Sequence, residues 1–431
     1  MSMIPQTGDL SSRHHDDSVF AKEDLDMKLS GSASETRAKT SLFGCYVFLT
    51  KSMMGIGMLQ LASVCAAYGW VLGIGLCVFA AGMTVVALMF NCQLAKDHPG
   101  SVISFYTVSK HISPSMCWLI DIACILDCFG ASVGYVQTTG LMMTDLLLQV
   151  TDWTIAPDVL CRYIQLIMIA VLGPFCFLKG ISKTAILSAI GLACIAYICV
   201  IPMVYSAKQP GTITPLWPES FMGSMAKLSI YFFAFSCMQN LFTVVNDIEN
   251  FTVRRVNAVC VSAVSTGLLV YLIVMIIPFA AFGTMTQTIF LANYNPETLA
   301  IQIAFFATVV QVSIGYVLAL HPTRQCILSL WYREAEPEAA REQRLRFMIT
   351  GALVVGTLGI ALLTDNLDAV TAFTGLIGAN TYCFTAPSYM FYLRYKYSKD
   401  HRVMWILSIA CLALSAVLYP VCLTAIIYEM I

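Results

Sequence analysis

The sequence predicts an all-α membrane protein with about eleven transmembrane helices. Hydrophobic residues make up 58% of the 431 residues and charged residues only 11%, whereas about 25% of the residues in an average soluble domain are charged. From Ser41 onward, apolar stretches follow one another, each close to the roughly 20 residues that a helix needs to cross a bilayer. The few charges lie mainly between these stretches. A water-soluble fold could not be covered by so few charges.

The first 40 residues differ from the rest of the chain. They are polar, rich in Ser, Asp and Lys, and they lack the apolar core that a cleavable signal peptide requires. We therefore predict a disordered cytosolic N-terminal tail over residues 1–40, followed by an eleven-helix domain over residues 41–428. The tail is long enough to bind a signalling partner.

The eleven predicted spans can be placed in order along the chain. Their approximate ranges are 41–65, 70–95, 115–149, 162–178, 184–206, 225–247, 256–283, 298–320, 346–364, 367–393 and 403–428.

The basic residues predict how the helices are oriented in the membrane. If the N-terminal tail is cytosolic, 20 of the 24 Lys and Arg residues fall on the cytosolic side. The opposite side then holds only Arg162, Lys208 and Lys227, and Lys51 lies inside the first span. Such an excess of positive charge marks the cytosolic side. The C-terminus, at Ile431, is expected on the extracytosolic side.

Composition and motifs exclude several classes of function. Lys and Arg (24) nearly balance Asp and Glu (25), so no positive surplus is present to bind nucleic acid. Most of the 17 cysteines lie in apolar runs, no Cys-x-x-Cys pair occurs, and the six histidines are scattered, which disfavours a metal site. No His-Glu-x-x-His motif is present, and no Gly-x-Ser-x-Gly elbow at a strand-to-helix turn stands out. We expect neither an enzyme nor a bound cofactor.

Within the first span, Gly55-Ile56-Gly57 breaks the pattern of an ordinary apolar helix. A glycine costs about 1 kcal/mol relative to alanine inside a helix. Two glycines in mid-span therefore favour a local unwinding that leaves backbone amides and carbonyls unpaired. The alternative is a close contact between helices through small residues.

The sixth span is interrupted in a similar way. Between Phe233 and Asn240, small and amide side chains interrupt an aromatic stretch about halfway across the membrane, and polar groups at that depth usually line a cavity. Spans 1 and 6 correspond in a division of the chain into five plus five spans, which is where discontinuous helices occur in transporters with inverted repeats. We predict a first repeat over 41–206, a second over 225–393, and a peripheral helix over 403–428.

Six separate segments carry a resemblance to a known family. They are Met53 to Leu61 with Gly69-Trp70, Phe129 to Tyr135, Pro174 to Lys179 with Ser188, Phe233 to Cys237, His321 to Arg324, and Phe373 to Ala379. In this order they resemble the amino acid/auxin permease family, particularly its sodium-coupled neutral amino acid transporter branch, within the superfamily that shares the leucine-transporter fold. The resemblance covers about residues 41–428.

The resemblance implies a binding site for an amino acid at the membrane midplane. The amides around Gly55, Ile56 and Gly57 would receive the substrate carboxylate, helped by the positive end of the half-helix that begins near Met58. The hydroxyl of Tyr135 could also reach the carboxylate, although a single aromatic residue in a span is more often packing.

At the second break, the carbonyls near Phe235 and Ser236 would accept hydrogen bonds from the substrate ammonium. The implied function is secondary active transport of amino acids by alternating access. A different class of function stays open, namely a sensor that binds amino acids and signals through its tail. The resident membrane is either the plasma membrane or a vacuolar or lysosomal membrane.

At three positions the sequence departs from the sodium-coupled branch. Lys51 stands where the family commonly has Asn, and Ala62 stands where a proline usually follows the first break. The hydroxyl expected from span 8 falls at Gly315, with Ser313 two residues away. Sodium coupling is therefore doubtful, and we expect transport that is proton-coupled or uncoupled.

Our hypothesis for Lys51 is that its ammonium takes the place of the coupling sodium. Three arrangements are open from the sequence. Lys51 could form a structural ion pair with Asp127, with Asp121 as the other available carboxylate; it could act as a proton carrier; or it could extend toward the interface.

Overall fold

The structure, a computed structural model, describes residues 39–98, 103–151, 154–178, 184–208, 214–218, 220–332 and 339–430. Within these ranges the chain is helical and forms no β-sheet; its one isolated β-bridge joins Thr40 to Ile248. The all-α membrane fold is confirmed. Residues 1–38 of the predicted tail and the terminal Ile431 lie outside the described residues.

The helices follow the predicted spans closely. They are α2 (Leu42–Met53), α3 (Gly57–Lys96), α4 (Phe105–Ile112), α5 (Cys117–Val150), α6 (Pro157–Cys176), α7 (Thr184–Tyr205), α8 (Phe221–Ala234), α9 (Leu241–Asp247), α10 (Val253–Phe282), α11 (Leu299–Trp331), α12 (Ala339–Leu363), α13 (Leu367–Phe373), the π-helix η6 (Thr374–Thr385), α14 (Ala386–Tyr395) and α15 (Arg402–Met430), with short 3-10 turns η1 (Pro114–Met116), η2 (Ser206–Lys208), η3 (Met238–Asn240), η4 (Gly283–Met285) and η5 (Phe290–Asn293).

In the described part of the chain, nine helical segments are long and apolar enough to cross a membrane. Eleven spans were predicted, and the difference concerns the first, second and tenth of them. The first predicted span is divided between the short apolar α2 and the start of α3, whose 40 residues also contain the second. The tenth is divided into α13, η6 and α14. The eleven-span topology itself stays a prediction.

Gly69 separates the two spans within α3. Its φ of +74° lies in a region that favours glycine. A Cβ atom at this position would lie 2.6 Å from the backbone carbon of Leu216. The loop that contains Leu216 packs on the turn, where Pro215 accepts a hydrogen bond of 3.2 Å from the Trp70 amide. Only glycine fits between this loop and the bend.

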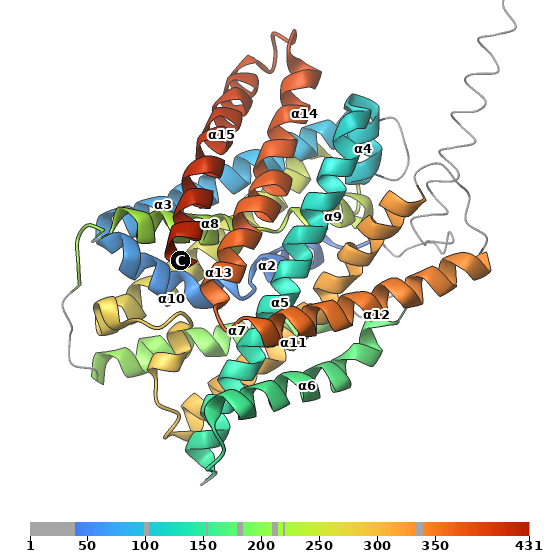
Figure 1. Cartoon of the computed structure of the whole chain (residues 1–431). Coiled ribbons are helices and arrows are strands. Elements are labelled where there is room, and N and C mark those ends of the chain that lie inside the picture. Colours follow the sequence, from blue (N-terminus) through green and yellow to red (C-terminus); the bar gives the residue numbers. More distant parts are fainter. Residues whose placement is uncertain are drawn as a thin grey trace, which may run out of the picture.

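The helices form one bundle in which segments from both halves of the chain are mixed. The most extensive contacts join α5 to α11 and α3 to α10. Figure 1 shows α14 and α15 side by side, and α6 beside α12 at another edge of the bundle. Many large apolar side chains on these outer helices are exposed, as expected for surfaces that face lipid. The inverted relation between the two halves stays a prediction.

Both predicted breaks are present. In span 1, α2 ends at Met53 and α3 begins at Gly57. In span 6, α8 ends at Ala234, residues 235–237 are not helical, and a 3-10 turn leads into α9. The two broken helices touch at the breaks, because a Cβ atom on Gly57 would lie only 2.7 Å from the Cα of Ala234.

On the side that the basic residues mark as cytosolic, spans 1 and 6 are joined again. The Thr40 amide donates to the carbonyl of Asp247 at 2.7 Å, and the Glu249 amide donates to the carbonyl of Thr40 at 3.2 Å. The Asn246 side chain exchanges two hydrogen bonds with the backbone of Ile103, at 3.0 and 2.7 Å. The Thr40 bonds hold the ends of spans 1 and 6 together in this conformation, and the Asn246 bonds join span 6 to the segment before α4.

Candidate functional site

The break in span 1 presents backbone N–H groups. The Gly55 amide is already paired, since it donates to the carbonyl of Met53 at 3.0 Å. The amides of Ile56, Gly57 and Met58, which begin α3, donate no hydrogen bond within the described residues. Unpaired N–H groups at a helix start are suited to bind an anion. The predicted role for Ile56 and Gly57 is thus geometrically possible, whereas Gly55 can contribute little beyond its shape.

A tyrosine that was not predicted from the sequence connects the two breaks. The Tyr271 hydroxyl, on α10, lies 2.8 Å from the carbonyl oxygen of Met53 and 2.6 Å from that of Ala234. Its single proton is shared between the last carbonyl of each half-helix. The side chain is fully buried, and the only signal in the sequence was a tyrosine in the middle of an apolar span. Tyr271 fixes the relative position of the two breaks.

The carbonyl oxygen of Met54, which the first break leaves outside any helix, accepts from two side chains. Lys51 Nζ lies 3.3 Å from it and Gln311 Nε2 lies 2.7 Å from it. Gln311 comes from α11 and is buried. Gln311 is not among the residues predicted from the sequence, although an amide in the apolar eighth span is a visible signal. A carbonyl of the kind that could bind a metal cation is here bound by an ammonium and an amide.

Lys51 and Asp127 do not form the ion pair that we considered. The Lys51 side chain is 4% exposed and turns toward the break and toward span 5, where a Cβ on Gly191 would lie 2.3 Å from Lys51 Cε. Asp127 instead accepts from Ser236. Because Lys51 Nζ reaches the Met54 carbonyl, it does not extend toward the interface either.

Tyr135 lies between the first break and span 8. A Cβ on Gly55 would lie 2.8 Å from its hydroxyl oxygen, and a Cβ on Gly315 would lie 2.7 Å from its ring. Gly315 is therefore needed as space for the tyrosine. The Tyr135 hydroxyl has no hydrogen-bond partner within the described ranges, and both Gly55 and Tyr135 keep some accessible surface. The position agrees with the predicted contact to a substrate carboxylate.

Ser313 is not brought to the break. Gln311 and Gly315 are four residues apart on α11 and share a face, whereas a residue two positions along a helix points to a different face. Ser313 is half-buried, and no hydrogen bond of its hydroxyl is found within the described ranges. Gln311, rather than Ser313, is the side chain of span 8 that reaches the first break.

The break in span 6 presents acceptors. No hydrogen bond to the carbonyls of Phe235 or Ser236 is found within the described residues. The Phe235 ring is fully buried against Tyr271, with ring centroids 4.8 Å apart. Ser236 donates its hydroxyl to Asp127 Oδ2 at 2.8 Å. The predicted carbonyls are thus available, and the structure adds a carboxylate to them.

Asp127 is a buried carboxyl group without a counter-charge. It is 2% exposed, and its Oδ1 has no hydrogen-bond partner within the described residues. The close packing comes from the π-helix of span 10, because a Cβ on Gly378 would lie 2.7 Å from the Asp127 Cα. The groups around it are Ser236, the Tyr135 phenol and the thiols of Cys124, Cys128, Cys237 and Cys383.

A cavity lies at the other ends of the broken spans, on the side predicted to be extracytosolic. It encloses about 380 Å³ and is lined by spans 1, 6, 10 and 11, including Ser63 and Glu429. In the wall of the cavity, Lys227 Nζ pairs with Asp368 Oδ2 at 2.8 Å, and Gln60 Nε2 donates to Asp368 Oδ1 at 3.0 Å. These three side chains link spans 1, 6 and 10. From the sequence, Lys227 was expected only to lie on the extracytosolic side.

The two breaks together fit a zwitterion. Amide donors and Lys51 surround the first break, whereas unpaired carbonyls and Asp127 surround the second. An α-amino acid carries a carboxylate and an ammonium on one carbon. Its two charged groups would each meet groups of opposite polarity.

Comparison with known proteins points the same way. The family described as transmembrane amino acid transporter protein matches residues 38–431. Vacuolar amino acid transporter 5 of Schizosaccharomyces pombe is 29% identical over 369 residues, which are 84% of this chain and 87% of that protein. Vacuolar amino acid transporter 6 of Saccharomyces cerevisiae is 24% identical over 299 residues, or 67% of this chain and 66% of that protein. Solute carrier family 38 member 10 of Mus musculus is 20% identical over 389 residues, or 86% of this chain and 35% of that protein.

Proposed function

Because the chain belongs to the transmembrane amino acid transporter family, we propose that it carries amino acids across a membrane by alternating access. The observation that carries this proposal is the opposite polarity of the two touching breaks. The amides of Ile56 and Gly57 receive the substrate carboxylate, and the carbonyls of Phe235 and Ser236 receive its ammonium.

Two sets of contacts on opposite sides of the breaks serve as gates in this proposal. The extracytosolic set is the link between Lys227, Asp368 and Gln60. The cytosolic set is the backbone pairing of Thr40 with Asp247 and Glu249. Alternating access requires that each set open while the other stays closed. The cavity beyond the Lys227–Asp368 pair is the entrance on that side.

The resident membrane in this proposal is the vacuolar membrane. Two of the relatives described above are named vacuolar amino acid transporters, and both match most of this chain. The N-terminus faces the cytosol and the C-terminus the lumen, as the basic residues predict. An acidic lumen would provide a proton gradient across this membrane.

The coupling ion in this proposal is the proton and not sodium. Lys51 and Gln311 bind the Met54 carbonyl that a sodium ion would otherwise use. Asp127 is the proton acceptor, because an isolated charge without a counter-charge is costly inside a membrane protein and protonation removes that cost. Its Ser236 contact links the proton to the break that binds the ammonium.

The test is uptake of labelled amino acids into proteoliposomes that contain the purified full chain, with proton and sodium gradients imposed separately. Uptake driven by a proton gradient without sodium supports the proposal. Uptake that requires sodium would overturn the proposed proton coupling but would still support amino acid transport. Saturable binding without flux under any gradient would replace the transporter by a sensor that signals through residues 1–40.

A further inference from the structure

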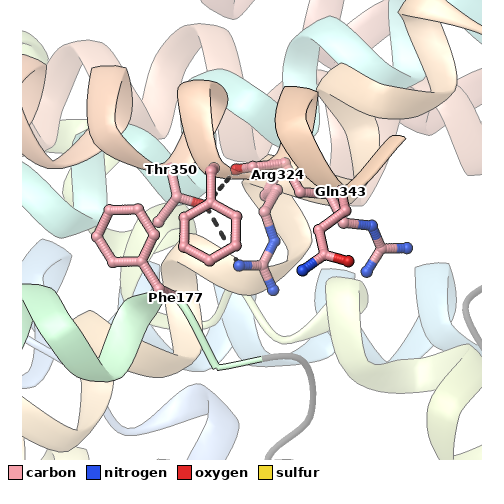
Figure 2. Close-up of a pocket in the computed structure, with 6 residues that line it drawn as sticks. Phe177, Arg324, Gln343 and Thr350 are labelled. Carbon is pink, nitrogen blue, oxygen red and sulfur yellow. Dashed lines mark hydrogen bonds between the residues drawn. The ribbon is translucent and has the colours of Figure 1, made fainter. Parts of the chain in front are cut away.

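We propose that the pocket around Arg324 binds the phosphate of an anionic phospholipid in the cytosolic leaflet. The pocket is formed by the segment directly after α6 together with α11 and α12. Its lining residues are Phe177, Arg324, Gln343, Arg346, Phe347 and Thr350 (Figure 2).

Arg324 is a buried cation whose partners are all neutral. It is 5% exposed. Its Nη1 donates to the Cys176 carbonyl at 2.9 Å and to Thr350 Oγ1 at 3.3 Å, and its Nη2 lies 3.5 Å from the Leu178 carbonyl. No carboxylate lies within 4 Å of it in the described part of the chain. The positive charge is therefore held in place but not neutralised.

The guanidinium keeps donors for a ligand. It has five N–H groups in a planar fork, and the three bonds above leave the Nε–H and one N–H of Nη2 unused. These two N–H groups can both donate to one oxygen of a phosphate group. The second arginine of the pocket does not compete, because Glu342 pairs with Arg346 at 2.7 Å. The uncompensated charge of the pocket is thus that of Arg324.

The surroundings favour a lipid over a free anion. Phe347, which lines the pocket, is exposed, and the neighbouring segments of the chain carry the exposed apolar side chains of Phe175, Leu178 and Met348. Acyl chains could lie against this surface. Beyond it, the start of α12 carries exposed Arg341 and Arg344, as expected near the cytosolic headgroups.

The size of the pocket limits what enters it. The enclosed space is about 10 Å³, which is close to the space of one water-sized group. One phosphate oxygen can enter toward Arg324 while the rest of the headgroup stays at the surface beside the exposed Gln343. A bound headgroup would join the ends of spans 4, 8 and 9, which Arg324 already connects through Cys176 and Thr350.

The experiment measures thermal unfolding of the purified full chain with short-chain lipids. We expect dioctanoyl phosphatidic acid to raise the Tm by several degrees more than dioctanoyl phosphatidylcholine does, because a ligand that binds only the folded state stabilises it. Equal Tm values with the two lipids would overturn the proposal. An equal rise with the same concentration of inorganic phosphate would show that the pocket binds a free anion and would overturn the proposal of a lipid ligand.

The critical variant is Gln343→Glu, which places a carboxylate beside Arg324 without changing the size of the side chain. It should fold, and the difference in Tm between the two lipids should disappear, since the pocket then contains its own counter-charge. The matched control is Arg341→Gln, which removes one exposed positive charge outside the pocket and should keep the difference. If the difference in Tm between the two lipids persists in Gln343→Glu, or is lost in Arg341→Gln, this pocket is not the lipid-binding site. Neither readout depends on transport.

Discussion

In the first span the backbone break is surrounded by donors, whereas in the sixth span it is surrounded by acceptors. Lys51 and Gln311 donate to the carbonyl of Met54, and the amides that begin α3 remain unpaired. At the other break Asp127 and unpaired carbonyls face the same region. The difference shows that two similar interruptions of a helix provide opposite polarity, depending on which side chains neighbouring spans add. Five substitutions can break or sharpen this comparison.

The largest effect is expected where the two breaks touch. Gly57→Ala places a Cβ 2.7 Å from the Cα of Ala234, and backbone cannot move aside as a side chain can. We expect uptake to fall by at least about 100-fold, corresponding to about 2.7 kcal/mol. The control is Gly75→Ala, where the added Cβ meets nothing within 4 Å. Near-normal uptake by correctly folded Gly57→Ala would show that the breaks do not need this contact.

Removal of the acidic group at the second break should have the next largest effect. Asp127→Asn keeps the shape and the contact with Ser236 but cannot bind and release a proton. Proton-driven uptake should fall by about 10- to 100-fold, corresponding to about 1.4 to 2.7 kcal/mol, while exchange of amino acids at equal pH continues. Asp158→Asn, at an exposed position at the start of α6, serves as the control. Loss of exchange as well would assign Asp127 to substrate binding.

Loss of the hydroxyl that connects the two breaks should have an intermediate effect. Tyr271→Phe removes the hydroxyl that bridges Met53 and Ala234, at a cost of about 1 kcal/mol for a hydrogen bond, with a further penalty for the unpaired carbonyls. We expect an approximately tenfold fall in the maximal uptake rate. Tyr316→Phe removes another buried hydroxyl, which contacts Thr357, and should change stability without changing transport. Equal transport in both variants would remove Tyr271 from the site.

Replacement of the cation at the first break tests the role of Lys51 directly. Lys51→Asn removes the ammonium from the Met54 carbonyl and supplies a neutral oxygen in its place. If the ammonium substitutes for sodium, uptake by the variant should become dependent on sodium. Initial rates in sodium and in choline buffers measure this. Unchanged uptake in both buffers would contradict the idea.

The smallest effect is expected at the gate outside the breaks. Asp368→Asn weakens the pair with Lys227, whose side chains are 28% and 22% exposed. Because partly exposed ion pairs contribute about 0.2 to 1 kcal/mol, uptake should change by only about two- to threefold, through easier opening of the cavity. Cysteine accessibility at an introduced Ser63→Cys provides the measurement. Unchanged accessibility would mean that this pair is not a gate.

Much of the architecture could be predicted because apolar length and glycine position are local properties. The breaks at Gly55 to Gly57 and at Phe235 to Ser236 were both predicted and observed. Of the three arrangements left open for Lys51, the pair with Asp127 is not formed. The sequence indicates the depth of each residue in the membrane but not the direction in which its side chain points. Gln311 and Tyr271 were missed for the same reason, since a single polar residue in an apolar span gives no direction.

The sequence by itself determined that the chain is a helical membrane protein with two interrupted spans, because hydropathy and backbone cost act residue by residue. Only the tertiary structure decided which polar groups meet. Asp127 accepts from Ser236 where Gly378 lets span 10 pack closely against span 3. Arg324 donates to the carbonyls of Cys176 and Leu178 and has no carboxylate partner among the described residues. Such pairings depend on how helices far apart in sequence pack together, which no local pattern contains.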